Sequence, residues 1–295
     1  HQTPINIRGQ AHSQNGSSTS NASILLATAN MNQLIEIDEE NLTVTCQAGF
    51  TRLALVDATL NKGLIPPVLT NNLGVSIAGS LSVAGLGVAS FRYGTQADNV
   101  IELEVVTGNG DIIVCSAEQN QALFDVVRCG LGQFGVITRT TLKLRRCAPN
   151  VRKYFLLYDD MEKLMADCAL LMSPEDGRFD SLEAWCTPTP QGVKKIGPGM
   201  KLGKGMQFFA YWTYPLHVTV EFDDEAPDAA KLLEGLGYYR HVHSETFTQE
   251  EFCLRLEPVF ELWQRSGYWE YAHPWMETIL PWQTSQPFVE NVLAN

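Results

Sequence analysis

Several features that define other classes of protein are absent from this sequence. No apolar run is long enough to cross a bilayer, because glycine, asparagine or charged residues interrupt the longest candidates. Basic residues are also few: 21 lysines and arginines stand against 33 aspartates and glutamates, a net charge of −12. An acidic surface of this kind repels phosphate backbones. We therefore expect neither a membrane span nor a nucleic-acid partner.

Paired cysteine motifs are missing as well. The seven cysteines are widely spaced, their number is odd, and none forms a Cys-x-x-Cys pair. Such spacing is typical of reduced thiols in a cytosolic protein rather than of a disulfide framework. No stretch resembling a signal peptide opens the sequence. The sequence thus favours a cytoplasmic location and leaves secretion open.

The motifs of hydrolases and zinc proteases are likewise absent. The sequence holds neither a Gly-x-Ser-x-Gly nor a His-Glu-x-x-His pattern. His241 and His243 put two imidazoles on one face of a predicted strand, a spacing that two metal ligands can use. No third ligand accompanies them, so we expect a surface pair and no metal site.

What is present is a globular composition long enough for two domains. The 295 residues are 45% hydrophobic and 18% charged. The pattern of elements changes at a linker-like stretch, residues 145–150. The sequence predicts an α+β protein with one domain over residues 1–147 and a second α+β domain, with an open and mainly antiparallel sheet, over residues 148–295.

Residues 1–147 alternate short β-rich runs with a few helices. Gly108-Asn109-Gly110 is a strong hairpin signal between two such runs. The predicted strands are Ile5–Arg8, Ser23–Thr28, Gln33–Asp38, Leu42–Ala48, Val100–Thr107, Asp111–Cys115 and Gly135–Leu144. The predicted helices are Phe50–Lys62, closed by a C-cap at Gly63, and Ala117–Cys129.

Longer strands and helices alternate in the second half. The predicted strands are Val151–Tyr158, Ser181–Thr187, Gln207–Val220 and Tyr238–Ser244. The predicted helices are Asp160–Met172, Ala226–Leu236, Gln249–Gln264 and a last one from Phe288 to the end. Gly192–Gly205 is rich in glycine and lysine, which predicts a surface loop.

One glycine motif matches a nucleotide-binding pattern in letters but not in context. Gly130–Gly135 reads Gly-x-Gly-x-x-Gly. The dinucleotide fingerprint needs a strand before the glycines and a helix after them. Here a predicted helix precedes and a strand follows, so we do not expect a nicotinamide-type site. The glycines serve as a helix cap and tight turn, or as close backbone approach to a bulky cofactor.

Two further stretches of small residues favour a large ligand. Gly74–Gly87 holds little core-forming side chain, so it forms either a tightly packed turn or the wall of a cofactor channel. Arg8–Ser18 is a loop that carries His12. A lone loop histidine is usually a solvated side chain. Three small-residue loops in one domain, one with a histidine, indicate a bound cofactor.

These motifs together resemble the FAD-binding PCMH-type domain of the vanillyl-alcohol oxidase superfamily, and within it most closely the cytokinin dehydrogenases. Arg8–Ser13 matches the family pattern Arg-Gly-x-Gly-His-Ser, with Ala11 in place of the second glycine. The other similar stretches are Leu81–Gly85, Phe91–Gly94, Asn99–Gly108 and Gly130–Arg139, and His273-Pro274-Trp275 in the family's substrate-cap domain. The resemblance covers about residues 5–147 and returns at residues 269–281.

The resemblance implies FAD as the cofactor, attached covalently through His12. It also implies a small-molecule substrate and an electron acceptor that is oxygen or a quinone. The FAD-contact positions that it implies are Ile7, Gly9, Gln10, Ala11, His12, Ser13, Ser17, Asn71, Ser76, Ser82, Leu86 and Ile137. The family layout further implies a first βαβ unit and a C-terminal return to the FAD domain, neither of which is part of this sequence.

The catalytic positions implied by the resemblance are Asn71 and Trp275. Cytokinin dehydrogenases have an aspartate where this chain has Asn71. An amide cannot take up a proton at ordinary pH and can only orient a substrate by hydrogen bonding. Trp275 is either an aromatic wall of the substrate pocket or an ordinary interface tryptophan.

The resemblance implies an FAD-dependent oxidoreductase that oxidises a small organic substrate by hydride transfer to flavin N5. The departure at Asn71 weakens a cytokinin substrate more than it weakens flavin chemistry, because hydride transfer does not need that residue to be acidic. Two alternatives stay open: a relative that binds a flavin or another ligand without catalysis, and an oxidase of an alcohol, a sugar or a biosynthetic intermediate.

Overall fold

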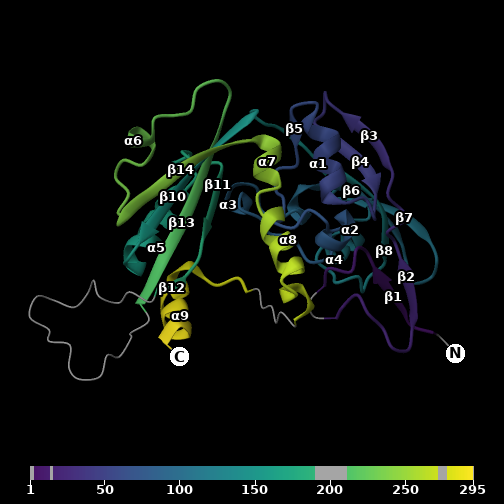
Figure 1. The fold of residues 1–295 in the computed structure, drawn as a ribbon. Helices are drawn as coiled ribbons and strands as arrows, with labels where there is room; N and C mark the ends of the chain where they lie inside the picture. The colour runs from purple at the N-terminus through teal and green to yellow at the C-terminus, as the bar shows by residue number, and fades with distance from the viewer. Residues whose placement is uncertain (1–2, 14–15, 190–210, 272–277, 295) are drawn as a thin grey trace, which may run out of the picture. The chain divides into compact units, whose positions relative to one another are not determined.

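The computed structural model describes residues 3–13, 16–189, 211–271 and 278–294. It divides into two compact units (Figure 1). Unit 1 comprises His1–Pro149 and Phe247–Glu277, and unit 2 comprises Asn150–Thr246 and Thr278–Asn295. All seven cysteines are free thiols, as the sequence predicts. Within the ranges given above, no helix is both long and apolar enough to cross a membrane.

Unit 1 is built around a five-stranded antiparallel sheet with the order β3-β4-β8-β6-β7. Its strands are β3 (Leu34–Asp38), β4 (Thr43–Gln47), β8 (Val136–Lys143), β6 (Val100–Val106) and β7 (Ile112–Ser116). Both hairpins predicted from the sequence, β3-β4 and β6-β7, are confirmed. In the second hairpin Gly110 has a φ of +89°, which only glycine adopts easily.

Short helices pack on this sheet and close the core of unit 1. They are α1 (Arg52–Leu60), α2 (Ile77–Leu81), α3 (Ser90–Tyr93), the 3-10 turn η1 (Ala97–Asn99) and α4 (Gln121–Val127). Leu55 of α1, Leu81 of α2 and Leu103 of β6 are completely buried in one cluster. The end of α1 differs from the prediction, because its C-cap is Asn61 and Gly63 lies two residues further, at a φ of +65°.

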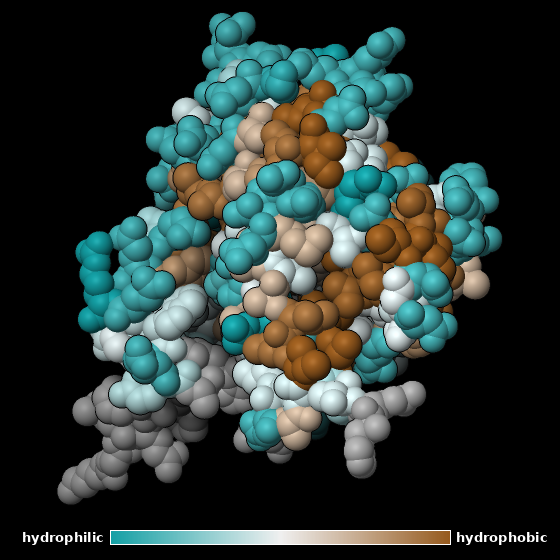
Figure 2. Space-filling view, turned by 90° about the vertical axis from the view of Figure 1, so that its right-hand side faces the viewer, coloured by the Kyte–Doolittle hydropathy of each residue, from teal (hydrophilic) through white to brown (hydrophobic). Residues whose placement is uncertain are grey.

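Two smaller strand pairs complete the first part of unit 1. β1 (Ile5–Arg8) and β2 (Ile24–Ala27) pair in parallel and leave Ile5 and Ile24 more than half exposed. Figure 2, which faces the side where β1, β2, β3 and β7 lie in Figure 1, shows hydrophobic side chains gathered in several surface patches. β5 (Leu64–Ile65) pairs with β9 (Arg145–Arg146). The predicted linker at residues 145–150 is therefore partly wrong, because this pairing satisfies its backbone.

The chain returns to unit 1 after β14, which the sequence did not predict. Here α7 (Gln249–Cys253), α8 (Glu257–Arg265) and the 3-10 turn η3 (Tyr268–Glu270) follow one another. Gln249 donates its backbone N–H to Pro149 at 2.8 Å, and Cys253 packs with Val56, Ile65 and Leu73. Residues 247–277 therefore belong to unit 1, whereas the sequence prediction placed them in the second domain, residues 148–295. The roles of the two units as FAD-binding and cap domains stay predictions.

The single helix predicted over residues 249–264 is wrong. Pro258 lies in the first turn of α8, where its missing N–H costs nothing. The same missing N–H prevents a continuous helix from α7, because Pro258 has no hydrogen to donate to the carbonyl of Leu254. The proline therefore divides the segment into α7 and α8.

Unit 2 holds a second sheet with the order β11-β13-β10-β14, and β12 pairs with β13 at one end. Its strands are β10 (Asn150–Tyr158), β11 (Ser181–Ala184), β12 (Thr187–Thr189), β13 (Tyr211–Phe222) and β14 (Arg240–Thr248). Its helices are α5 (Met161–Leu171), α6 (Ala229–Leu232) and α9 (Trp282–Ala294). β10 and β11 both run antiparallel to β13, as predicted for this half. The predicted loop Gly192–Gly205 lies outside the described residues.

Alternation along β10 explains the core of unit 2. Tyr154, Leu156 and Tyr158 point to one face and are almost completely buried against Leu164 and Leu171 of α5. Successive side chains of a strand point to opposite faces, so the residues between them face away from α5.

Two predicted helices are shorter than expected: α6 stops before Gly235, which has a φ of +79°, and α4 ends before Cys129, which has a φ of +60°.

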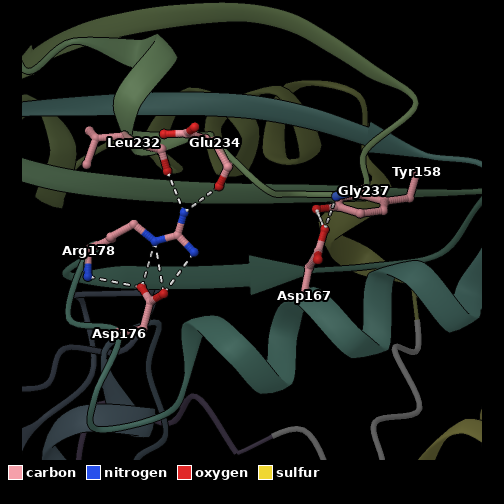
Figure 3. Close-up of polar contacts among 7 residues, drawn as sticks. All are labelled: Tyr158, Asp167, Asp176, Arg178, Leu232, Glu234 and Gly237. Atoms are coloured by element: carbon pink, nitrogen blue, oxygen red, sulfur yellow. Dashed lines mark hydrogen bonds and ion pairs between the residues drawn. The ribbon is translucent and has the colours of Figure 1, made fainter.

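Two clusters of polar contacts connect separate segments of unit 2 (Figure 3). Arg178 donates to both carboxylate oxygens of Asp176 and to the backbone carbonyls of Leu232 and Glu234. The Asp167 carboxylate accepts hydrogen bonds from the Tyr158 hydroxyl and the Gly237 N–H, both at 2.7 Å. Burial, followed by this hydrogen bond, raises the pKa of Tyr158 far above its usual value.

We expect Tyr158→Phe to destabilise unit 2. The change leaves the buried Asp167 carboxylate without its hydroxyl donor, which costs about 1–3 kcal/mol of unfolding free energy. Chemical denaturation of the two proteins measures the difference. Tyr271→Phe is the matched control, because Tyr271 is 68% exposed. An effect of Tyr158→Phe no larger than the control would contradict this account.

Candidate functional site

Unit 1 contains a cavity of about 560 Å³. Three stretches far apart in the sequence bound it, the first with residues 5–13 and 17–18, the second with residues 75–86 and the third with residues 127–137, together with Thr28 and Thr70. The size is within the range of small-molecule and cofactor sites. The three small-residue loops singled out from the sequence therefore meet at one place.

The structure brings most of the predicted cofactor-contact residues together. Those that line the cavity are Ile7, Gly9, Gln10, Ala11, His12, Ser13, Ser17, Ser76, Ser82, Leu86 and Ile137. Asn71 is not among the lining residues, although its neighbour Thr70 is. Trp275, with the rest of the His273–Trp275 motif, lies outside the described residues.

Glycine lets the walls of the cavity approach one another. A Cβ on Gly9 would lie 2.1 Å from Ser76 Oγ, whereas one on Gly135 would lie 2.5 Å from a methyl group of the core residue Val105. Gly130 serves the tight turn after α4, since its Cβ would meet the carbonyl of Val126 at 2.1 Å. Gly132 has a φ of +72° and lines the cavity. The tight-turn interpretation of the Gly130–Gly135 motif thus holds at Gly130, while close approach to a cofactor stays a prediction.

Ala11 holds a backbone conformation that favours glycine. Its φ is +61°, and it stands where the resembled motif has glycine. This conformation costs a residue with a Cβ roughly 1–2 kcal/mol, whereas glycine loses roughly 0.5–1 kcal/mol more backbone entropy on folding. We expect Ala11→Gly to raise the unfolding free energy by up to about 1 kcal/mol in thermal or chemical denaturation. A lower stability of the variant would contradict strain at Ala11.

His12 faces the cavity with its ring oriented by a neighbour. Its Nδ1 lies 3.3 Å from the side-chain nitrogen of Asn72, whose Oδ1 accepts the Gly74 N–H at 2.8 Å. His12 is exposed overall, but partial burial of its ring lowers the pKa of His12 below 6.5, while a hydrogen bond to the Gly74 backbone raises it to a smaller extent. The imidazole is therefore neutral at pH 7, the state in which it acts as a nucleophile.

Asn72 is the functional neighbour that sequence reasoning missed. It belongs to no motif, and its contact with His12 spans 60 positions of sequence. A local signal was available, since asparagine commonly accepts a backbone N–H two residues further on, as it does here from Gly74. Nothing in that turn indicates which distant ring the amide contacts.

Asn71 points elsewhere. Its Oδ1 accepts a hydrogen bond of 2.8 Å from Nη2 of Arg255, which lies just after α7. The acceptor of the amide is thus engaged by a cation, and the side chain does not line the cavity. The predicted part of Asn71 in catalysis or FAD contact gains no support from this geometry and stays a prediction.

The chemistry of the wall suits a large, partly apolar nucleotide. Hydroxyl groups come from Ser13, Ser17, Ser76, Ser82 and Thr70, among others, and apolar surface from side chains such as Leu86. No charged side chain lines the cavity in the part of the chain that the structure describes. Hydroxyl and backbone donors match phosphate, ribityl and ring-carbonyl oxygens, and apolar side chains match a planar ring.

A cluster of ionisable side chains lies in unit 2, and the sequence did not predict it. Lys153 of β10 is within 3.3 Å of Glu183 of β11, and His217 Nδ1 of β13 lies 3.7 Å from the same carboxylate oxygen. Burial lowers the pKa of His217, while Glu183 raises it to a smaller extent. Phe155 stacks on His243 with ring centroids 3.9 Å apart. This face of the sheet combines aromatic rings with a buried ion pair.

The predicted histidine pair is not arranged around a common ligand. His243 stacks on Phe155, whereas His241 Nε2 lies 2.8 Å from Ser244 Oγ. Among the residues with described positions, no three His, Cys, Asp or Glu side chains are grouped so that they could hold a metal ion.

Comparison with known proteins indicates the same kind of ligand as the chemistry of the cavity wall. Residues 1–116 match the family model described as FAD binding domain. The chain is 32% identical over 290 residues to an "uncharacterized oxidoreductase" of the fasciation locus of Rhodococcoides fascians, covering 98% of this chain and 61% of that protein. Residues 1–116 thus match an FAD-binding domain, and the chain as a whole is similar to this oxidoreductase.

Plant cytokinin dehydrogenases show the same extent of similarity. Cytokinin dehydrogenase 9 of Oryza sativa subsp. japonica is 32% identical over 308 residues, which cover 98% of this chain and 58% of that protein. Cytokinin dehydrogenase 3 of Arabidopsis thaliana is 28% identical over 298 residues, covering 94% and 56%. The chain therefore spans about three fifths of the length of these flavoproteins.

Proposed function

We propose that this chain is part of an FAD-dependent oxidoreductase that oxidises a small organic substrate by hydride transfer to flavin N5. The observation that carries the proposal is the convergence of three small-residue loops on one cavity that His12 faces. When bound, FAD supplies the ring position that accepts the hydride. The similarity to an oxidoreductase and to cytokinin dehydrogenases supports the same chemistry.

We further propose that His12 is the covalent attachment point. Its ring faces the cavity, is neutral at pH 7 because burial lowers its pKa, and is oriented by Asn72. A neutral imidazole has a free lone pair for bond formation, which the protonated ring lacks. The backbone and hydroxyl groups of Gly9, Ser13 and Ser76 would hold the remainder of the cofactor.

The substrate, the electron acceptor and the location are parts of the same proposal. An allylic amine of the cytokinin type is the first substrate to test, because relatives are named cytokinin dehydrogenases. The acceptor is oxygen or a quinone, and the seven free thiols support a cytoplasmic location.

The decisive experiment is an absorption spectrum of the purified protein before and after acid precipitation, with the intact mass measured in parallel. A flavin spectrum that stays with the precipitate, and a mass increased by FAD, are the expected results. Anaerobic addition of substrates then tests whether the flavin is reduced. A colourless full-length protein without flavin mass would refute the proposal.

The second candidate is a relative that binds flavin without catalysis. The contact between Asn71 and Arg255 favours it, because the side chain in the position of the family aspartate is an amide held by a cation. A bound flavin that no allylic amine, alcohol or sugar reduces would support this candidate. Rapid reduction by any of these compounds would exclude it. Asn71→Asp tests the position directly: gain of activity on an allylic amine would link the chain to cytokinin oxidation.

A further inference from the structure

Arg52 is a buried cation next to the cavity. It is the first residue of α1 and only 1% exposed. Its Nε and Nη2 both donate to Ser80 Oγ, at 3.2 and 2.9 Å, and Ser80 Oγ donates to the carbonyl of Ile77 at 3.0 Å. Ser80 lines the cavity, whereas Arg52 does not. The guanidinium thus lies one hydrogen bond behind the cavity wall.

No residue with a described position supplies a counter-charge for this cation. None of the ion pairs between described residues includes Arg52. Burial lowers the pKa of Arg52 to about 10, so the side chain is still charged at pH 7. The nearby Cys46 thiol is no anion either, because burial raises its pKa. A buried charge without a partner is costly for the fold.

Arg52 is hydrogen-bonded to two residues of the cavity wall. Its side chain donates to Ser80, and its backbone N–H donates to the carbonyl of Val75 at 3.0 Å. The described lining carries no charged side chain that would oppose or screen the guanidinium. Away from bulk water, a charge acts strongly over a few ångströms. An anion in the cavity would therefore compensate the charge that the described residues leave unpaired.

We propose that Arg52 is a positioning residue that acts through Ser80 and supplies the counter-charge for the pyrophosphate of FAD. The inference rests on the proposed function, since it takes the ligand of the cavity to be FAD. It adds a property that the cavity lining alone does not have: selection of a phosphate-bearing flavin over an uncharged one. Binding of the cofactor would offset the free-energy cost of burying the Arg52 cation.

The test compares the binding of FAD and riboflavin, which share the ring but differ in charge. The full chain carrying His12→Ala serves as the parent, so that binding is reversible, and flavin fluorescence is titrated with the protein. Arg52→Met in this parent is expected to weaken FAD binding on the order of tenfold, or about 1.4 kcal/mol. Riboflavin affinity should change less than about twofold, because an uncharged ligand gains little from the guanidinium. Arg52→Lys should retain most of the FAD preference.

A purely structural role predicts a different pattern. Equal losses of FAD and riboflavin in Arg52→Met, or no loss of either, would overturn the proposal. Thermal unfolding of the flavin-free proteins is the second readout: Arg52→Met should be at least as stable as its parent, because an uncompensated buried charge has been removed. If the methionine variant does not fold, Arg52→Gln against Arg52→Lys makes the same comparison.

Failure of the two proposals can be told apart. A parent that binds FAD and riboflavin equally, alongside a wild-type chain that carries flavin mass, overturns the counter-charge and leaves the flavoprotein assignment intact. A parent that binds neither flavin, with no flavin mass on the wild-type chain, overturns both.

Discussion

Replacing His12 with alanine is expected to free the flavin from the protein. In the wild-type chain the flavin should stay with the acid precipitate, whereas in His12→Ala it should appear in the supernatant. The reason is that the ring of His12 is the only imidazole among the residues found to line the cavity, and it is held neutral and oriented. Absorbance of the two fractions and the intact mass measure the result.

His241→Ala is the matched control for His12→Ala, because it removes a histidine that belongs to unit 2 and is not among the cavity-lining residues. The flavin of this variant should remain with the precipitate. If His12→Ala also retained its flavin through acid treatment, the attachment site would lie elsewhere.

Covalent attachment should also depend on pH in a defined direction. Protonation removes the lone pair of the imidazole, so attachment slows as the pH falls through the His12 pKa. Because that pKa is lowered below 6.5, the rate at pH 7 should already be at its plateau. Incubation of the flavin-free chain with FAD at different pH values, followed by acid precipitation, gives the profile.

Gly9→Ala is expected to have the second large effect. The new Cβ would lie 2.1 Å from Ser76 Oγ and 3.1 Å from Ser76 Cβ, so the Ser76 side chain in the cavity wall must rotate and shift. Overpacking of this kind costs about 1–3 kcal/mol of unfolding free energy. Because Gly9 and Ser76 both line the cavity, the flavin content should fall together with stability. Denaturation and the flavin-to-protein absorbance ratio measure the two effects.

Two further variants show whether the clash is the cause. Gly108→Ala is the control, because nothing lies within 4 Å of the position of its added Cβ, and it should be close to neutral. Gly9→Ala with Ser76→Gly removes the atoms in conflict and should recover part of the stability and flavin content. A double variant as impaired as Gly9→Ala would show that the loss has another origin.

Local features of the fold could be predicted well from the sequence. The Gly108–Gly110 turn needs glycine at a positive φ, and alternation along β10 separates the buried tyrosines from the opposite face. Such signals depend on neighbours within a few residues, so the strands of the five-stranded sheet and both of its hairpins were expected. Pro258 was equally visible, but its effect in dividing α7 from α8 was overlooked.

Long-range features could not be predicted in the same way. Cys253 packs with Val56, and this contact returns α7 to the first unit after about a hundred residues of the second. The spacing of apolar residues indicates which side of a helix is apolar, but not against which core that side packs. The same limit applies to Arg52: an arginine at the start of a helix is normally exposed, and only its position beside Ser80 shows that it is buried.

The sequence by itself determined the resemblance to FAD-binding flavoproteins, the order of the small-residue loops and His12 as the candidate anchor, because motif spacing reflects local backbone requirements. The tertiary structure alone decided that these loops enclose one cavity, that Asn72 orients His12, that Asn71 turns to Arg255 and that a charge lies behind the wall. Each of these depends on side chains brought together from distant positions. Their contacts follow from how the whole unit packs, which no short pattern records.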